Sequence, residues 1–137
     1  MKNIYDNLAL AAISARDSAY SPYSGYTVGA ALLTKSGKMY LGSNIENASY
    51  SLTMCAERVA IFKAVADGER EFSAIAVAGA KSGERVGAPF SPCGSCRQVL
   101  SEFCSPDTKI IVVTGEGYEL YTLGQLLPAG FGKKDLV

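Results

Sequence analysis

Apolar residues recur at helical spacing near the start of the chain. One helix face would carry Ile4, Leu8, Ala11, Ala12, Ala15 and Ala19, which follow the i, i+4, i+7, i+8 pattern. We predict a helix over this stretch that ends before residues 20–25, where Pro22 and Gly25 interrupt it. Because most of its apolar positions are alanine, this helix should lie close against a sheet.

Five stretches have the β-branched or alternating apolar character of strands. They cover residues 26–34, 39–43, 73–80, 108–113 and 118–121. The first two flank Lys35-Ser36-Gly37-Lys38, a turn sequence that predicts a β-hairpin. A glycine-rich loop is expected over residues 79–91, and it is the segment that we expect to be most mobile.

A second helix is predicted to start from a cap at Ser51 or Thr53 and to run to Asp67, where Gly68 ends it. It is apolar nearly all round, so we expect it to be buried on every side. A third helix opens at residues 92–95 and runs to Phe103, and a last helical turn covers residues 123–127.

Strands that alternate with helices predict an α/β fold. We expect a three-layer α/β/α arrangement around a central mixed sheet of about five strands. No repeat or long linker divides the chain, so residues 1–137 should form a single catalytic domain.

Composition and charge argue against several classes of partner. Hydrophobic residues make up 48% of the 137 residues and charged residues 19%, which is typical of a packed globular protein. Thirteen basic residues balance thirteen acidic ones without a basic cluster, so we predict no nucleic-acid partner. No stretch reaches the roughly 18–20 apolar residues of a membrane span. Residues 1–6 lack the apolar run of a signal peptide, so we expect a cytoplasmic protein without a membrane partner.

The candidate chemistry lies in two cysteine motifs. Cys55 is followed by Glu57, and Cys93 and Cys96 form a Pro-Cys-x-x-Cys pair, in a chain without histidine. Three cysteines can hold a soft divalent metal and leave one coordination position for water, which is the design of a catalytic zinc site. Both motifs open predicted helices, whose positive ends favour the thiolate form of cysteine.

Two residues beside Cys55 complete this hypothesis. Glu57 is the candidate catalytic group that would carry protons to and from the water. Three thiolates on Zn²⁺ leave a net negative charge, and the Arg58 guanidinium could offset it by donating to the ligand sulfurs.

Two other interpretations of the cysteine motifs remain open. A Cys-x-x-Cys pair in a reducing compartment can be a thiol redox centre. A closed, non-catalytic zinc module is the other alternative, and it would need a fourth protein ligand. The chain has no histidine for this role, and Cys104 could serve only if the short helix folded back.

Several segments resemble the cytidine deaminase family in its short, homotetrameric, zinc-dependent form. In family order they are Tyr20-Ser21-Pro22-Tyr23-Ser24, Val28-Gly29-Ala30-Ala31-Leu32, Asn44-Ile45-Glu46-Asn47-Ala48, Cys55-Ala56-Glu57-Arg58, Ser91 to Gln98 and Leu126-Leu127-Pro128. Together they run through nearly the whole chain.

The resemblance implies a reaction and its machinery. One Zn²⁺ per subunit would be held by Cys55, Cys93 and Cys96, and zinc-bound hydroxide would attack C4 of cytidine or deoxycytidine. Glu57 would shuttle the protons, and ammonia would leave to give uridine or deoxyuridine, a step of pyrimidine salvage. Asn44 and Glu46 would hold the ribose.

The same resemblance implies further contacts to the nucleoside. The Ala56 N–H would contact the pyrimidine O2, and Phe131 would reach the site of a neighbouring subunit in a homotetramer. Tyr26 stands where the family usually has Phe, close to the base or ribose, and its hydroxyl could alter affinity or sugar preference.

Charge bears on the choice of substrate. A carboxylate at Glu46 would repel a 5′-phosphate, and no Arg or Lys flanks its loop, so we expect nucleosides rather than nucleotides as substrates. A related deaminase of another cytosine-bearing compound, such as blasticidin S, is the closest alternative.

Overall fold

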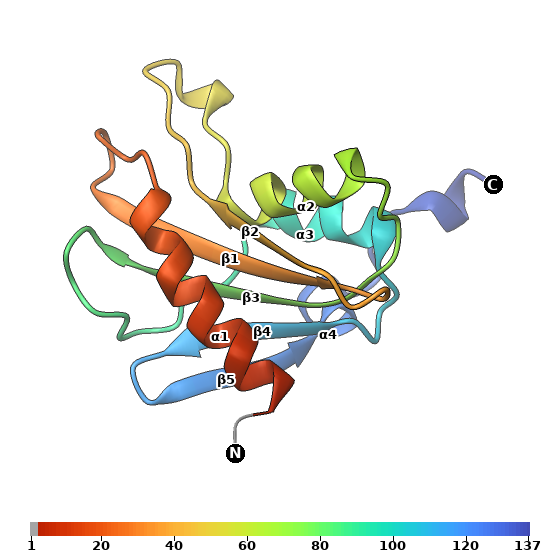
Figure 1. The fold of residues 1–137 in the computed structure, drawn as a ribbon. Helices are drawn as coiled ribbons and strands as arrows, with labels where there is room; N and C mark the ends of the chain where they lie inside the picture. The colour runs from red at the N-terminus through yellow and green to blue at the C-terminus, as the bar shows by residue number, and fades with distance from the viewer. Residues whose placement is uncertain (1–2) are drawn as a thin grey trace.

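A mixed five-stranded sheet forms the centre of the computed structural model, which describes residues 3–137 (Figure 1). Met1 and Lys2, which open the segment considered above for a signal peptide, lie outside the described residues. The strands are β1 (Tyr26–Thr34), β2 (Met39–Ser43), β3 (Phe72–Lys81), β4 (Lys109–Thr114) and β5 (Gly117–Thr122), in the order β2-β1-β3-β4-β5. Only the β3–β4 pair is parallel, because α3 connects those two strands across the sheet.

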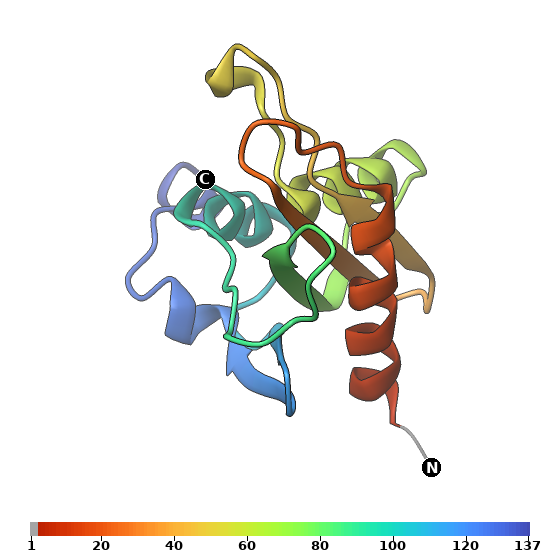
Figure 2. The same cartoon turned by 90° about the vertical axis from the view of Figure 1, so that its left-hand side faces the viewer.

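Helices cover both faces of this sheet, as Figure 1 and Figure 2 show. Helix α1 (Ile4–Ala15) lies on one face, whereas α2 (Ala56–Ala66) and α3 (Gly94–Phe103) lie on the other. A single turn, α4 (Leu123–Leu126), follows β5. The three-layer α/β/α prediction is therefore confirmed.

Alternation along the strands sorts the core into two clusters. In β3, Ile75 and Val77 pack toward α2 and α3, whereas Ala74, Ala76 and Ala78 pack toward α1. The alanine-lined face is shallow, so α1 approaches the sheet closely. A Cβ atom at Gly29 of β1 would lie only 2.0 Å from the Ala12 carbonyl oxygen of α1.

The start of α2 is held equally close to the sheet. A Cβ atom at Gly42 of β2 would lie 2.3 Å from the Ala56 carbonyl oxygen. Glycine at this position therefore lets the first turn of α2 lie directly on the backbone of β2.

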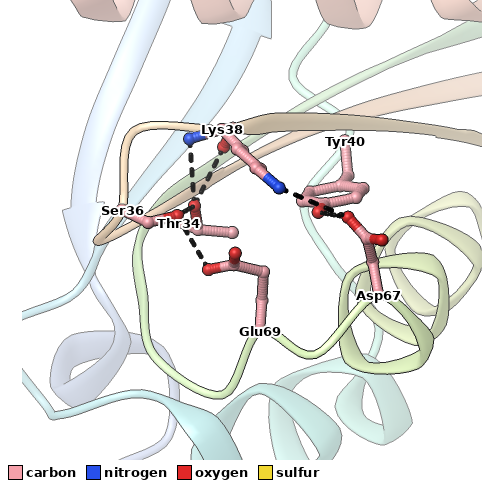
Figure 3. A network of polar contacts seen from close by, with 6 residues as sticks. All are labelled: Thr34, Ser36, Lys38, Tyr40, Asp67 and Glu69. Atoms are coloured by element: carbon pink, nitrogen blue, oxygen red, sulfur yellow. Dashed lines mark hydrogen bonds and ion pairs between the residues drawn. The ribbon is translucent and has the colours of Figure 1, made fainter.

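A polar network fixes the other end of α2 to the β1–β2 hairpin (Figure 3). The Tyr40 hydroxyl donates to the Asp67 carboxylate, which also lies 3.7 Å from the Lys38 ammonium. Ser36 Oγ donates to Glu69 Oε1 over 2.9 Å. The donation from Tyr40 holds the pKa of Asp67 below its usual range, and that of Tyr40 is raised to about 12. Helix α2 is thus anchored at both ends.

The structure corrects four details of the sequence prediction. Helix α1 gives way to a 3-10 turn after Ala15, and α2 starts at Ala56 with Cys55 as its N-cap, so neither Ser51 nor Thr53 caps it. Strand β3 continues to Lys81, so Gly79 lies in a strand and not in the loop. Helix α2 is not buried all round, because Phe62 is exposed. None of the helices in residues 3–137 has the length and apolarity needed to cross a membrane.

Candidate active site

A cavity of about 290 Å³ lies where the start of β1, the end of β2 and the N-termini of α2 and α3 meet. Its volume is close to the lower end for small-molecule pockets, about 300 Å³. Its lining comprises Ser24, Tyr26, Val28, Asn44, Thr53, Met54, Cys55, Ala56, Glu57, Phe90, Ser91 and Cys93. Most residues singled out from the sequence therefore line one hollow.

Three cysteine sulfurs come together at this cavity. Cys55 Sγ lies 3.8 Å from Cys93 Sγ, which lies 3.5 Å from Cys96 Sγ, and all three fall within 4.8 Å of one another. A tetrahedral zinc with bonds of about 2.3 Å would hold its sulfurs ~3.8 Å apart. The spacing of the three sulfurs therefore fits a zinc ion.

The two helix starts explain why the sulfurs converge. Cys55 is the N-cap of α2 and Cys93 the N-cap of α3, while Cys96 lies in the first turn of α3. Neither N-cap side chain accepts a hydrogen bond from its own helix, so both thiols are free to turn toward the cluster.

The electrostatics of the cluster favour a thiolate. The pKa of Cys55 is lowered to about 5, chiefly by its hydrogen bond with Cys96 and also by its contact with Arg58. The pKa of Cys96 is raised, because the neighbouring Cys55 and burial both favour the protonated form. The site therefore holds negative charge on sulfur, the form that binds a metal.

Glu57 is buried in the first turn of α2 and lines the same cavity. Burial is the main reason that its pKa is raised to about 7, and the charge of Cys55 adds to the effect. A carboxyl group with such a pKa can both accept and donate a proton near neutral pH.

Arg58 lies against the cysteine cluster, as its position in the sequence suggested. Its Nη2 donates to Cys55 Sγ over 3.3 Å, and this contact is the main reason that the pKa of the guanidinium is raised. The Arg58 Nε is buried and has no hydrogen-bond partner among residues 3–137.

Asn44 directly follows β2 and braces the start of β1. Its Oδ1 accepts from the Val28 N–H over 2.9 Å, and its Nδ2 donates to the Tyr26 carbonyl over 2.9 Å. One N–H and one lone pair of the amide remain for a ligand in the cavity.

Glu46 lines an adjoining hollow with Tyr23, Ser24, Tyr50 and Thr53. Its carboxylate accepts from the Ser24 hydroxyl and from the backbone N–H groups of Tyr23 and Ser24. The bond from the Ser24 side chain is the largest influence that lowers the pKa of Glu46. The side chain is therefore ionised and held beside the main cavity, which shares Ser24 and Thr53 with this hollow.

The other residues predicted to contact the substrate are Ala56, Tyr26 and Phe131. Ala56 is the first residue of α2, so its N–H has no acceptor within the helix. Tyr26 lines the cavity, with 38% of its surface exposed. Phe131 is 61% exposed and does not line this cavity.

Cys104 stands apart from the cluster. Within residues 3–137 the group of possible metal ligands consists of Cys55, Cys93 and Cys96 alone. Cys104 follows α3 and packs against the hydrophobic core, where burial raises its pKa to about 11. A closed zinc module with Cys104 as fourth ligand therefore has no support in the fold.

Phe90 is a cavity residue that was not predicted from the sequence. This residue lines the cavity, but no motif includes it. Its one signal in the sequence is its position two residues before Pro92.

Comparisons with known proteins agree on one family. Residues 2–114 match the family described as "Cytidine and deoxycytidylate deaminase zinc-binding region". A cytidine deaminase of Sporosarcina psychrophila is 50% identical over 123 residues, which cover 89% of this chain and 87% of that protein. One from Halalkalibacterium halodurans is 48% identical and covers 91% of this chain and 92% of its own.

Solved structures lead to the same group. The crystal structure of cytidine deaminase from Burkholderia pseudomallei superimposes with a TM-score of 0.82 at 45% identity. The match covers 91% of this chain and 97% of that one.

Proposed function

The chain belongs to the cytidine and deoxycytidylate deaminase family, and we propose that Cys55, Cys93, Cys96 and Glu57 carry out its reaction. That reaction is the zinc-dependent hydrolytic deamination of cytidine and deoxycytidine to uridine and deoxyuridine. The observation that carries the assignment is the buried carboxyl group of Glu57 in the same cavity as the converging cysteine sulfurs. We further propose that residues 1–137 act as a single catalytic domain.

Cys55, Cys93 and Cys96 would hold the metal, and Arg58 would moderate the charge of their sulfurs. Bound there, zinc would act as a Lewis acid that lowers the pKa of a water molecule. Glu57 accepts a proton from the attacking water and delivers one to N3 of the base. Once the water oxygen has bonded to C4, Glu57 takes the second proton from that oxygen and passes it to the amino group. The C4–N bond then breaks, ammonia leaves, and C4 keeps the oxygen as a carbonyl.

The residues around Glu57 orient the nucleoside. The Ala56 N–H is available to donate to the pyrimidine O2, and Asn44, which directly follows β2, keeps one N–H and one lone pair for the ligand. Asn44 and Glu46 bind the ribose hydroxyls, with Tyr26 beside them. The C4 of the base then lies toward the cysteines and Glu57.

Nucleosides should be preferred to nucleotides. Glu46 is ionised in the hollow that adjoins the main cavity, and neither hollow is lined by Lys or Arg among the described residues. We expect kcat/KM for dCMP to be at least about 100-fold lower than for deoxycytidine, since juxtaposed like charges cost several kcal/mol. Ultraviolet absorbance with cytidine, deoxycytidine and dCMP measures this directly.

Two results of that assay would change the assignment. Equal or faster turnover of dCMP would contradict the charge argument at Glu46. If zinc-loaded protein converted none of the three compounds, the nucleoside assignment would be wrong, and blasticidin S would be the next substrate to test.

We also propose that the protein is a homotetramer whose sites are completed by neighbouring subunits. The supporting observation is apolar surface that one chain leaves uncovered. It includes Phe62 on α2 and the projecting segment of residues 45–52 (yellow in Figure 1), where Tyr50 is 73% exposed. Phe131 is likewise exposed and lies away from the cavity of its own chain.

An experiment that mixes two defective variants tests whether the site is shared between subunits. Phe131→Ala should lower activity without loss of zinc, and Glu57→Ala should be inactive. When the two variants are unfolded, mixed and refolded, part of the activity should return. In a mixed oligomer, Phe131 of a Glu57→Ala subunit can complete the site of a Phe131→Ala subunit, which still has its Glu57. Light scattering should give the mass of four chains. A monomeric mass, or no recovery in mixed oligomers, would contradict the proposal.

A cytoplasmic location is the last part of the proposal. All four cysteines are free thiols, and a reducing compartment keeps the three clustered thiols available for metal.

A further inference from the structure

Phe90 forms part of the cavity wall beside the cysteine cluster. It lies in the segment between β3 and α3, shortly before Cys93, and 38% of its surface is exposed. An aromatic side chain that large, at the edge of a cavity of about 290 Å³, occupies space that a ligand would otherwise fill.

The ring of Phe90 rests directly on the backbone of β3. A Cβ atom at Gly79 would lie 2.6 Å from Cγ and 2.7 Å from Cδ1 of Phe90, too close for any side chain. The φ of Gly79 is not positive, so the backbone conformation does not require glycine there. Glycine at this position instead leaves the space that the Phe90 ring occupies. Gly79 therefore forms the surface on which that ring packs, which we call its seat.

Tyr26 supports the same ring from the side. The two ring centroids lie 6.1 Å apart with 32° between the planes, and Tyr26 also lines the cavity. Together, Tyr26 and Phe90 form a continuous aromatic wall.

The segment that carries Phe90 is fixed on both sides. Arg16 is buried, and its Nη2 donates to the carbonyls of Lys81 and Glu84. The Gly115 N–H donates to the Gly87 carbonyl over 2.8 Å, and Arg97 Nε donates to the Pro92 carbonyl over 2.8 Å. Phe90 is therefore held in place as part of a built wall.

The orientation proposed for the nucleoside decides which edge of the base meets this wall. Its N3 and O2 edge faces Glu57 and Ala56 at the start of α2, and C4 faces the cysteines. The opposite edge, which carries C5 and C6, then faces the wall that comes from the segment before α3, where Phe90 is the large side chain.

We propose that Phe90, seated on Gly79 and packed beside Tyr26, is a specificity-determining residue that limits the size of the substituent at C5 of the pyrimidine. The inference rests on the proposed function. It concerns which substituted cytidines enter the site, and the chemistry at C4 remains that of the cysteines and Glu57.

The test compares kcat/KM for 5-iodocytidine and for cytidine in the wild type, Phe90→Ala and Phe90→Leu. The ratio of the two values should rise at least about 10-fold in Phe90→Ala and by less in Phe90→Leu, in the range that a few buried atoms contribute to discrimination. Because the electronic effect of iodine is the same in each enzyme, it cancels from the comparison between variants.

Phe103→Leu is the matched control, because it also removes a ring from an aromatic pair, here with Phe72, but lies outside the cavity. Its ratio should equal that of the wild type. A ratio within about twofold of the wild type in the folded, zinc-loaded Phe90 variants would overturn the proposal. If Phe90→Ala does not fold, Phe90→Leu decides. Failure of the proposed function would instead show in the wild type, as lack of cytidine turnover.

Gly79→Ala provides an independent check of the seat. It should change the 5-iodocytidine to cytidine ratio when Phe90 is present and leave it unchanged in the Phe90→Ala background, as a double-mutant cycle would report. Gly87→Ala is the control, since a Cβ atom there meets nothing within 4 Å and its φ is not positive. Equal effects of Gly79→Ala in both backgrounds would contradict the assignment.

Discussion

Glu57→Gln should lower kcat for cytidine by roughly 10²–10⁴-fold, the range that a positioned general acid–base contributes. Glutamine keeps the shape of the side chain and can still form hydrogen bonds, but it cannot take up or release a proton at neutral pH. The effect should be large because Glu57 is buried in the cavity, so bulk water cannot easily replace it as proton carrier. Steady-state kinetics with cytidine measure the loss.

The same variant must retain its metal for this result to be informative. Because Glu57→Gln leaves all three cysteines intact, zinc content should stay at one ion per chain. Glu102→Gln is a suitable control, since Glu102 is exposed on α3 and outside the cavity, and its kcat should match the wild type. A Glu57→Gln protein with zinc bound and more than about a tenth of wild-type kcat would exclude Glu57 as the proton carrier.

Cys93→Ala should abolish both zinc binding and activity. Cys93 Sγ lies within 3.8 Å of Cys55 Sγ and within 3.5 Å of Cys96 Sγ, so its removal leaves two sulfurs for the ion. Loss of an outer-shell partner alone costs about 10–100-fold in metal affinity, so loss of a direct ligand should cost more than about 100-fold. Metal analysis after dialysis, together with the deamination assay, measures both effects.

Cys104→Ala is the matched control for this experiment. Cys104 packs against the core and lies outside the cluster, so the variant should keep one zinc per chain and wild-type kcat. Loss of zinc from Cys104→Ala as well as from Cys93→Ala would favour a closed structural module over a catalytic site.

Much of the local structure follows from the sequence alone. The apolar runs of β3 and β4 and the helical spacing of residues 4–15 predict their elements to within a few residues. The candidate metal ligands could also be identified, because Cys93 and Cys96 are close in the chain and Cys55 precedes a glutamate. These features depend on residues that are neighbours along the chain, so they can be predicted without knowledge of the tertiary packing.

Other features needed the tertiary structure. The strand order β2-β1-β3-β4-β5 brings the starts of α2 and α3 to one cavity, although Cys55 and Cys93 lie far apart in the sequence. The exposure of Phe62 reverses the expectation from an apolar helix, because pattern alone does not show which surfaces one chain covers.

The contact between Phe90 and Gly79 is the clearest example of a feature that only the tertiary structure shows. By sequence, Gly79 is a loop glycine and Phe90 an apolar residue before a motif, and neither suggests the other. Their pairing depends on a segment between β3 and α3 that folds back over β3, where contact distances of a few ångströms decide what fits. The helices, the strands and the reactive residue types could be read from the chain, because they depend on neighbours along it. Which side chains share the cavity, and which aromatic rings line it, emerged from packing, because those contacts join residues that the chain keeps apart.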